Sequence, residues 1–291
     1  MTALDRVSGC ATLPRGGALA FEIDGCAHGG TPLLLIRPLG GSMALWGRFR
    51  ARLAEERQVI AFDLRGSGHS SPDPAWVTTA GLAKDSLHLL DHLDVMRVDV
   101  FGISLGAMAA TWLAILAPGR VGKLCLASAP ARGLALTRGG LRRELALAAC
   151  FARRADDVEV AVVDRILSSG FRTEHPDEVR DIERRVRAAP ATRTALLKHA
   201  LAGVLHDARR ELAQIDAPTL VLAGERDALL GTAAPRALAA AIPRATFEVV
   251  SGAGHDLTLE QPIATATRVA GFLDAAYGSA QPLGNAAASA R

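Results

Sequence analysis

The sequence lacks the features of a disulfide-rich protein, a metal protein or a nucleic-acid-binding protein. It has only four cysteines in 291 residues, without close pairing and without histidines at metal-ligand intervals, so neither a disulfide framework nor a zinc site is expected. The 33 basic residues are nearly balanced by 30 acidic ones, which argues against a nucleic-acid partner. No signal-peptide pattern of roughly 7–15 apolar residues and a cleavage site is found near the N-terminus. A cytoplasmic location is therefore predicted.

One uncharged stretch, residues 100–119, is as long as the ~20 residues that a helix needs to span a bilayer. It contains Gly102, Ser104 and Gly106 in its first half, and a strand that turns into a buried helix explains the same apolarity. We therefore expect no membrane association. With 49% hydrophobic and 22% charged residues, the composition is that of an ordinary globular protein.

Short apolar runs bounded by turn residues indicate buried β-strands. Six such runs are found, at 33–36, 59–62, 98–103, 124–127, 219–223 and 246–250. Between most of them lie segments with helical spacing, such as 46–56, 79–93 and 107–116. This alternation predicts the α/β class, with a mostly parallel, doubly wound sheet covered by helices on both faces. Ligands of such sheets bind at the carboxyl ends of the strands.

The pattern changes between residues 131 and 210, where strand-like runs nearly vanish and helix formers dominate. We predict a core of residues 1–130 and 211–277, into which residues 131–210 are inserted as a helical cap. A final helix is expected over residues 258–276. Residues 278–291 have little apolar character and are predicted to be a disordered tail.

The sharpest motif is Gly-Ile-Ser-Leu-Gly at residues 102–106, directly after one predicted strand and directly before a helical run. A turn this tight strains the backbone at Ser104 and leaves no room for side chains two residues before and after it, which explains Gly102 and Gly106. Ser104 would then project its hydroxyl at the top of the sheet. We take it as the candidate nucleophile, against the alternative of a glycine-rich turn with an incidental serine.

A serine hydroxyl needs a base, and the base needs an orienting carboxylate. His255 follows a predicted strand in the loop SGAGHD, and Asp227 follows another in the loop GERD. Both lie at carboxyl ends of the predicted sheet, so His255 is the candidate base and Asp227 the candidate acid. Glu225 and Asp256 are rival acids, although Asp256 adjoins His255 and would reach its Nδ1 with poor geometry.

These features resemble the α/β-hydrolase superfamily, specifically its enol-lactonase, esterase and haloperoxidase-like branch. The order serine, acid, histidine is that of the superfamily. Further similar motifs are FDLRGSGHS at 62–70, LVLAGERD at 220–227 and GAGHDLTLEQP at 252–262. The resemblance covers roughly residues 18–130 and 211–276. It implies the α/β-hydrolase fold and a serine hydrolase that cleaves a small-molecule carboxylic ester or lactone through an acyl-enzyme on Ser104, without a metal or organic cofactor.

The resemblance also implies an oxyanion hole formed by the backbone N–H groups of Leu39 and Leu105. The family usually has His-Gly where this chain has Arg37-Pro38, and Pro38 has no N–H to donate. Two roles are open for Arg37. It can form a structural ion pair, or it can bind a substrate carboxylate through its planar guanidinium.

Other functions remain open from the sequence alone. The same residues are compatible with carbon–carbon bond hydrolysis, thioester cleavage, acyl transfer, or a slow-turnover ligand-binding signalling protein. His88 and His92 lie four residues apart on a predicted helix, a spacing that can bind a metal, but a solvated helix face is favoured. If His255 is the base, activity should fall as the pH drops through roughly 6–7.

Overall fold

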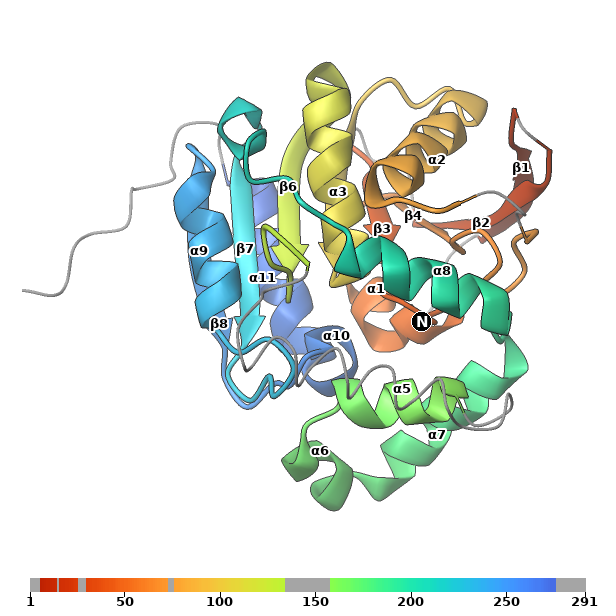
Figure 1. The fold of residues 1–291 in the computed structure, drawn as a ribbon, viewed down its shortest axis with the longest axis vertical. Helices are drawn as coiled ribbons and strands as arrows, with labels where there is room; N and C mark the ends of the chain where they lie inside the picture. The colour runs from red at the N-terminus through yellow and green to blue at the C-terminus, as the bar shows by residue number, and fades with distance from the viewer. Residues whose placement is uncertain (1–5, 15, 26–29, 73–75, 134–157, 276–291) are drawn as a thin grey trace, which may run out of the picture.

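The computed structural model describes residues 6–14, 16–25, 30–72, 76–133 and 158–275. Within them, eight strands form one sheet in the order β1-β2-β4-β3-β5-β6-β7-β8 (Figure 1). All pairs from β4 to β8 are parallel, and only β2 runs antiparallel to its neighbours. The strands are β1 (Val7–Thr12), β2 (Ala18–Asp24), β3 (Leu33–Ile36), β4 (Val59–Phe62), β5 (Val98–Ile103), β6 (Val121–Ala127), β7 (Thr219–Gly224) and β8 (Ala245–Val250). The predicted α/β class and mostly parallel sheet are confirmed.

Helices cover both faces of the sheet, as predicted. One face packs against α2 (Thr79–His92), α3 (Leu105–Leu116) and α9 (Ala233–Ala241), and the other against α1 (Gly47–Ala54) and α11 (Pro262–Asp274). The central strands β3 to β7 are buried along their whole length, which explains why they are continuously apolar in the sequence.

One sequence prediction requires correction. The final helix is not continuous over residues 258–276, because α10 (Leu257–Glu260) ends before Pro262, which opens the separate helix α11. The uncharged stretch of residues 100–119 is, as predicted, a strand that turns into a buried helix: it comprises the end of β5, the turn at Ser104, α3 and the start of a 3-10 helix. Among the described residues, no helix is both long enough and apolar enough to cross a bilayer.

Four described helices lie between β6 and β7 in the chain, where the sequence predicts a cap. They are α5 (Val158–Ile166), α6 (Ser169–Glu174), α7 (Pro176–Ala188) and α8 (Arg193–Val204). Figure 1 shows α5, α6 and α7 beyond the ends toward which the strand arrows of β6 and β7 point. The cap boundaries at residues 131 and 210 stay a prediction, and the predicted tail of residues 278–291 lies outside the described residues.

Candidate active site

The turn between β5 and α3 has the geometry of a nucleophile elbow. Ser104 has φ 53° and ψ −118°, a strained conformation for a residue with a side chain. A Cβ on Gly102 would lie 2.4 Å from the carbonyl oxygen of Gly106, and a Cβ on Gly106 would lie 2.1 Å from that of Ile36. Both positions therefore require glycine, and the close approach of strand and helix holds the Ser104 hydroxyl at the carboxyl end of β5.

The structure brings Ser104, His255 and Asp227 together in one hydrogen-bonded chain. His255 Nε2 lies 2.9 Å from Ser104 Oγ, and His255 Nδ1 lies 2.9 Å from Asp227 Oδ2. The three residues follow β5, β7 and β8, so three separate strand ends meet at one point. His255 and Asp227 are both buried. This is the arrangement that activates a serine hydroxyl.

Neither rival acid contacts the imidazole of His255. Glu225 is exposed and accepts hydrogen bonds from Ser251 Oγ and the N–H of Gly252. Asp256 is buried and bound to Arg37 instead. The geometry therefore favours Asp227 as the partner of His255.

Burial and charge act in opposite directions on this pair. Burial disfavours the imidazolium, but the carboxylate of Asp227, through its charge and its hydrogen bond, outweighs that effect and raises the pKa of His255 above its ordinary value. Burial likewise disfavours the Asp227 carboxylate, but His255 and the N–H groups of Leu229 and Leu230 together lower the pKa of Asp227. An ionised Asp227 holds the Nδ1–H tautomer of neutral His255, which leaves the Nε2 lone pair facing Ser104.

Two residues that the sequence motifs do not single out, Ser128 and Glu260, fix the loop carrying His255. The Ser128 hydroxyl donates to the carbonyl oxygen of His255 at 2.7 Å. The carboxylate of Glu260 accepts from the N–H of Gly254 at 2.9 Å, and from the N–H and hydroxyl of Ser168 at 2.6 and 2.7 Å. Glu260 therefore ties this loop to the start of α6. Its signal was present in the motif at 252–262, but only the fold shows what it contacts.

The geometry around Arg37 bears on the two roles that the sequence left open for it. Its side chain is fully buried, forms an ion pair with Asp256 at 2.9 Å, and lies over the Trp46 ring at 4.6 Å from the centroid. Burial is the strongest influence and lowers the pKa of Arg37, against the charge of Asp256. Arg37 does not line the pocket at Ser104. This geometry favours the structural ion pair over the substrate-binding role.

A pocket opens beside Ser104 and His255, with a mostly apolar wall. Its lining includes Pro38, Leu39, Leu105, Met108, Val162, Ile166, Val204, Leu229 and Leu230. Leu105 is the first residue of α3, so its N–H has no acceptor within the helix. The N–H of Leu39 likewise has no acceptor among the described residues. Both predicted oxyanion donors therefore border the pocket with N–H groups that are not used elsewhere.

The alternative of a metal site on α2 finds no support in the geometry. His88 is half-buried and His92 is exposed, and the neighbouring Asp85 is bound to Arg65. Among the described residues, no group of three or more histidine, cysteine, aspartate or glutamate side chains is arranged to hold a metal ion.

Comparison with known proteins relates this architecture to a family. Residues 31–262 match the family model of the alpha/beta hydrolase fold. The chain is 30% identical over 234 residues to 3-oxoadipate enol-lactonase 2 of Acinetobacter baylyi, a match that covers 79% of this chain and 84% of the relative. It is 31% identical over 243 residues to the poly(3-hydroxyalkanoate) depolymerase of Ectopseudomonas oleovorans, with 84% of each chain covered.

A solved structure agrees with these sequence matches. The enol-lactonase from Burkholderia xenovorans superimposes with a TM-score of 0.80 and 25% identity, and the match covers 91% of this chain and 99% of that chain. The resemblance stated from the sequence motifs is confirmed. The chain therefore belongs to the α/β-hydrolase fold family and, like these relatives, is a hydrolase.

Proposed function

We propose that the protein hydrolyses a small carboxylic ester or lactone through an acyl-enzyme on Ser104. One observation carries the proposal: a strained serine, a buried histidine and a buried aspartate form a continuous hydrogen-bonded chain at the mouth of an apolar pocket. A structural role would not require a serine at φ 53° beside a histidine whose other nitrogen is held by a carboxylate.

In the acylation step, Ser104 Oγ attacks the substrate carbonyl carbon while its proton passes to His255 Nε2. The N–H groups of Leu39 and Leu105 donate to the oxyanion of the tetrahedral intermediate. Asp227 stabilises the imidazolium that forms. The intermediate collapses when the bond to the leaving oxygen breaks, and His255 gives its proton to that oxygen. The alcohol leaves, or, in a lactone, stays attached at the far end of the acyl chain.

In the deacylation step, a water molecule repeats the chemistry in reverse. His255 takes a proton from the water, whose oxygen attacks the acyl carbon of the Ser104 ester. The second intermediate uses the same two N–H donors. Its collapse returns the proton from His255 to Ser104 Oγ and releases the carboxylic acid, so the enzyme is unchanged after each turnover.

The pocket wall supports a largely apolar substrate. Two relatives are named as an enol-lactonase and a poly(3-hydroxyalkanoate) depolymerase, and both names describe cleavage of a carboxylic ester bond. Arg37 is paired with Asp256 outside the pocket lining, and Arg165, which does line the pocket, is exposed to solvent. We therefore place uncharged esters and lactones first.

The first test needs no knowledge of the substrate. A fluorophosphonate should label the purified protein on Ser104, as mapped by mass spectrometry, and Ser104→Ala and His255→Ala should abolish the label. A panel of lactones, short and long acyl esters, and thioesters then measures turnover, which separates ester hydrolysis from thioester cleavage and from a slow-turnover receptor. Absence of the label in the native protein would contradict the proposal.

A further inference from the structure

Helix α8 crosses the pocket beside the two proposed oxyanion donors. Leu196 packs against Gly40, the residue after Leu39, and a Cβ on Gly203 would lie 3.7 Å from Leu105. His199 lies one turn from each of these contacts on the same buried face of α8. It belongs to the pocket wall. The helix therefore positions an imidazole next to the space where the scissile carbonyl of a substrate would bind.

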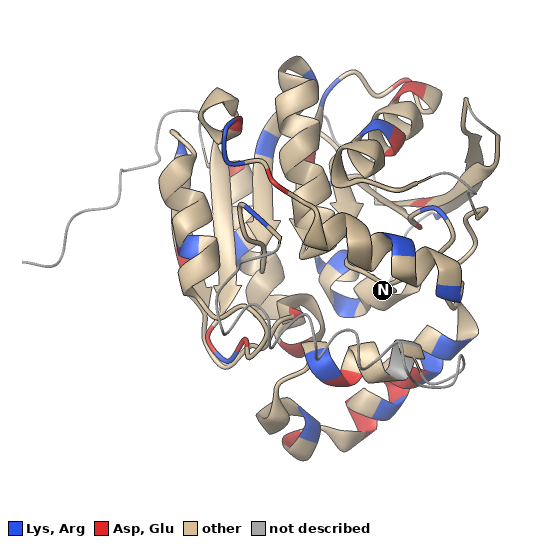
Figure 2. Ribbon diagram, viewed as in Figure 1, with Lys and Arg blue, Asp and Glu red and all other residues tan. Residues whose placement is uncertain are grey.

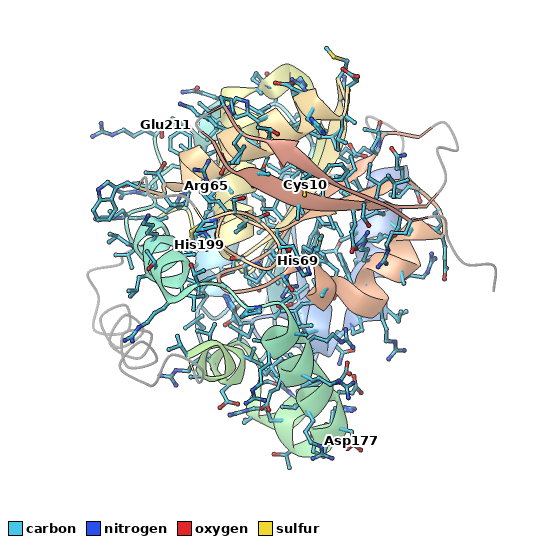
Figure 3. All side chains as sticks on the ribbon, turned by 90° about the vertical axis from the view of Figure 1, so that its right-hand side faces the viewer. Cys10, Arg65, His69, Asp177, His199 and Glu211 are labelled. Atoms are coloured by element: carbon cyan, nitrogen blue, oxygen red, sulfur yellow. The ribbon has the colours of Figure 1, made fainter. Side chains whose placement is uncertain are left out.

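The imidazole of His199 is buried without a full hydrogen bond. The residue has no exposed surface, and neither ring nitrogen has a partner of good geometry within the described chain. Against the stronger effect of burial, the backbone of Arg65 raises the pKa of the ring, as a nearby carbonyl acceptor does, and the two residues are labelled near each other in Figure 3. A buried polar group in this state requires an explanation, because it costs free energy.

Burial lowers the pKa of His199 to about 4, so the ring is neutral near pH 7. A neutral imidazole has one N–H and one lone pair. If the N–H faces the Arg65 carbonyl, the other nitrogen is an acceptor, and no donor for it is present among the described residues. A ligand that satisfies this nitrogen must supply a donor.

The other polar groups of the pocket wall do not share this state. Ser104 and His255 are bound to each other, and Arg165 is exposed to solvent. His206, the other deeply buried histidine next to α8, keeps one nitrogen 3.0 Å from Thr79 Oγ1 and does not line the pocket. His199 is therefore the one buried polar side chain in the described wall that is free to bind a ligand group.

We propose that His199 is a specificity determinant that accepts a hydrogen bond from a hydroxyl or amide N–H of the substrate, close to the scissile carbonyl. The inference rests on the proposed function, since the carbonyl is the one that Ser104 attacks. A substrate with such a donor gives the buried acceptor a partner, whereas a substrate without one leaves it unpaired, so the site discriminates against the latter.

Binding to a variant without turnover tests this preference directly. In Ser104→Ala, calorimetry would compare methyl hexanoate with each enantiomer of its 2-hydroxy, 3-hydroxy and 2-acetamido derivatives. We expect the best-placed donor ester to bind about tenfold more tightly than methyl hexanoate. The hydroxy and acetamido arms distinguish the two sources of the donor.

Substitution of His199 should then remove the preference. In the Ser104→Ala background, His199→Phe should weaken the donor ester about tenfold and leave methyl hexanoate unchanged, whereas His199→Gln, which keeps an acceptor, should restore part of the preference. His206→Phe is the matched control and should leave the preference intact. If His199→Phe fails to fold, His199→Leu replaces it.

Two results would overturn the proposal: a preference that survives loss of the imidazole, or no preference for any donor ester, including no binding at all. Fluorophosphonate labelling of Ser104 and hydrolysis of methyl hexanoate by the native chain test the proposed function separately. Failure of the His199 proposal is therefore distinguishable from failure of the proposed function.

Discussion

Asp227, Asp256 and Glu260 at the carboxyl edge of the sheet are buried and hydrogen-bonded from several elements, whereas the charged side chains of α7 (Figure 2) are exposed or half-buried and paired along one helix. Asp227 accepts from His255 and from two backbone N–H groups, and Glu260 joins the His255 loop to α6. On α7, Asp177 pairs with Arg180 three residues away, and both are largely exposed. Buried charges fix geometry, and exposed charges mainly keep a helix surface hydrated.

The largest effect is expected from Asp227→Asn, which keeps the shape of the side chain but removes the charge that holds the Nδ1–H tautomer of His255. We expect kcat for ester hydrolysis to fall about 10⁴-fold, measured by initial rates on the variant after its fold is checked by circular dichroism. Glu225→Gln, a change in the same loop on an exposed side chain, should leave kcat within about twofold. If kcat of Asp227→Asn fell by less than about tenfold, the proposed role of Asp227 would be contradicted.

The buried ion pair provides the next largest contrast. Arg37→Met leaves Asp256 buried without its charged partner, and we expect the free energy of unfolding to fall by about 3–5 kcal/mol, measured by urea denaturation. A loss below about 1 kcal/mol would show that Asp256 is solvated or protonated in the variant. The ion pair would then not be what holds the loop that carries Leu39 to the segment after His255.

The pH profile tests the electrostatics of the site. Burial works against the imidazolium, but Asp227 outweighs it and raises the pKa of His255, while the reaction needs the neutral form. The acid limb of kcat/KM should therefore have its midpoint above the ordinary histidine pKa, with a tenfold loss per pH unit below it. In Asp227→Asn, burial loses its main opposing influence, so the limb should move to lower pH. A limb that stays in place would assign it to another group.

The raised pKa of His255 also makes the stability of the folded protein depend on pH. A group that binds protons more tightly when folded stabilises the protein below its unfolded pKa, and this contribution is lost as the pH rises through the folded pKa. Asp227, with its lowered pKa, contributes stability above its unfolded pKa and loses it as the pH falls. Activity and the His255 contribution to stability should therefore change in opposite directions across the acid limb.

Glu260 tests whether α6 and the His255 loop act together. Glu260→Gln keeps the size of the side chain but replaces one acceptor oxygen with a donor, so one of the N–H groups of Gly254 and Ser168 loses its partner. We expect kcat to fall about tenfold with KM nearly unchanged, because the loop that carries His255 becomes less fixed. Initial rates over a range of substrate concentrations measure both kcat and KM. Ser168→Ala should reproduce part of the loss, and a change in KM alone would contradict a positioning role.

The sequence predicts the carboxyl ends of the central strands well, because the signals for them are local in the chain. Buried strands are continuous apolar runs, and Gly102 follows from a clash with Gly106 within the same turn, although the clash that requires Gly106 is with Ile36 on β3. The first two strands were missed, since the edge strand β1 is largely exposed and lacks a continuous apolar run, and β2 carries Glu22 and Asp24. The burial of His199 and the contacts of Glu260 could not be predicted, because each depends on the packing of α6 or α8 against loops distant in the chain.

The smallest effect is expected on α7, where loss of an exposed charge should leave stability and activity almost unchanged. Arg180 and Asp177 are mostly exposed, so water already solvates each charge and salt screens the pair. Arg180→Met should change the free energy of unfolding by no more than about 0.5 kcal/mol and leave kcat unchanged, measured by urea denaturation and initial rates beside Arg37→Met. An effect of the size expected for Arg37 would mean that α7 contributes a charge to folding or catalysis, and that burial alone does not separate the two regions.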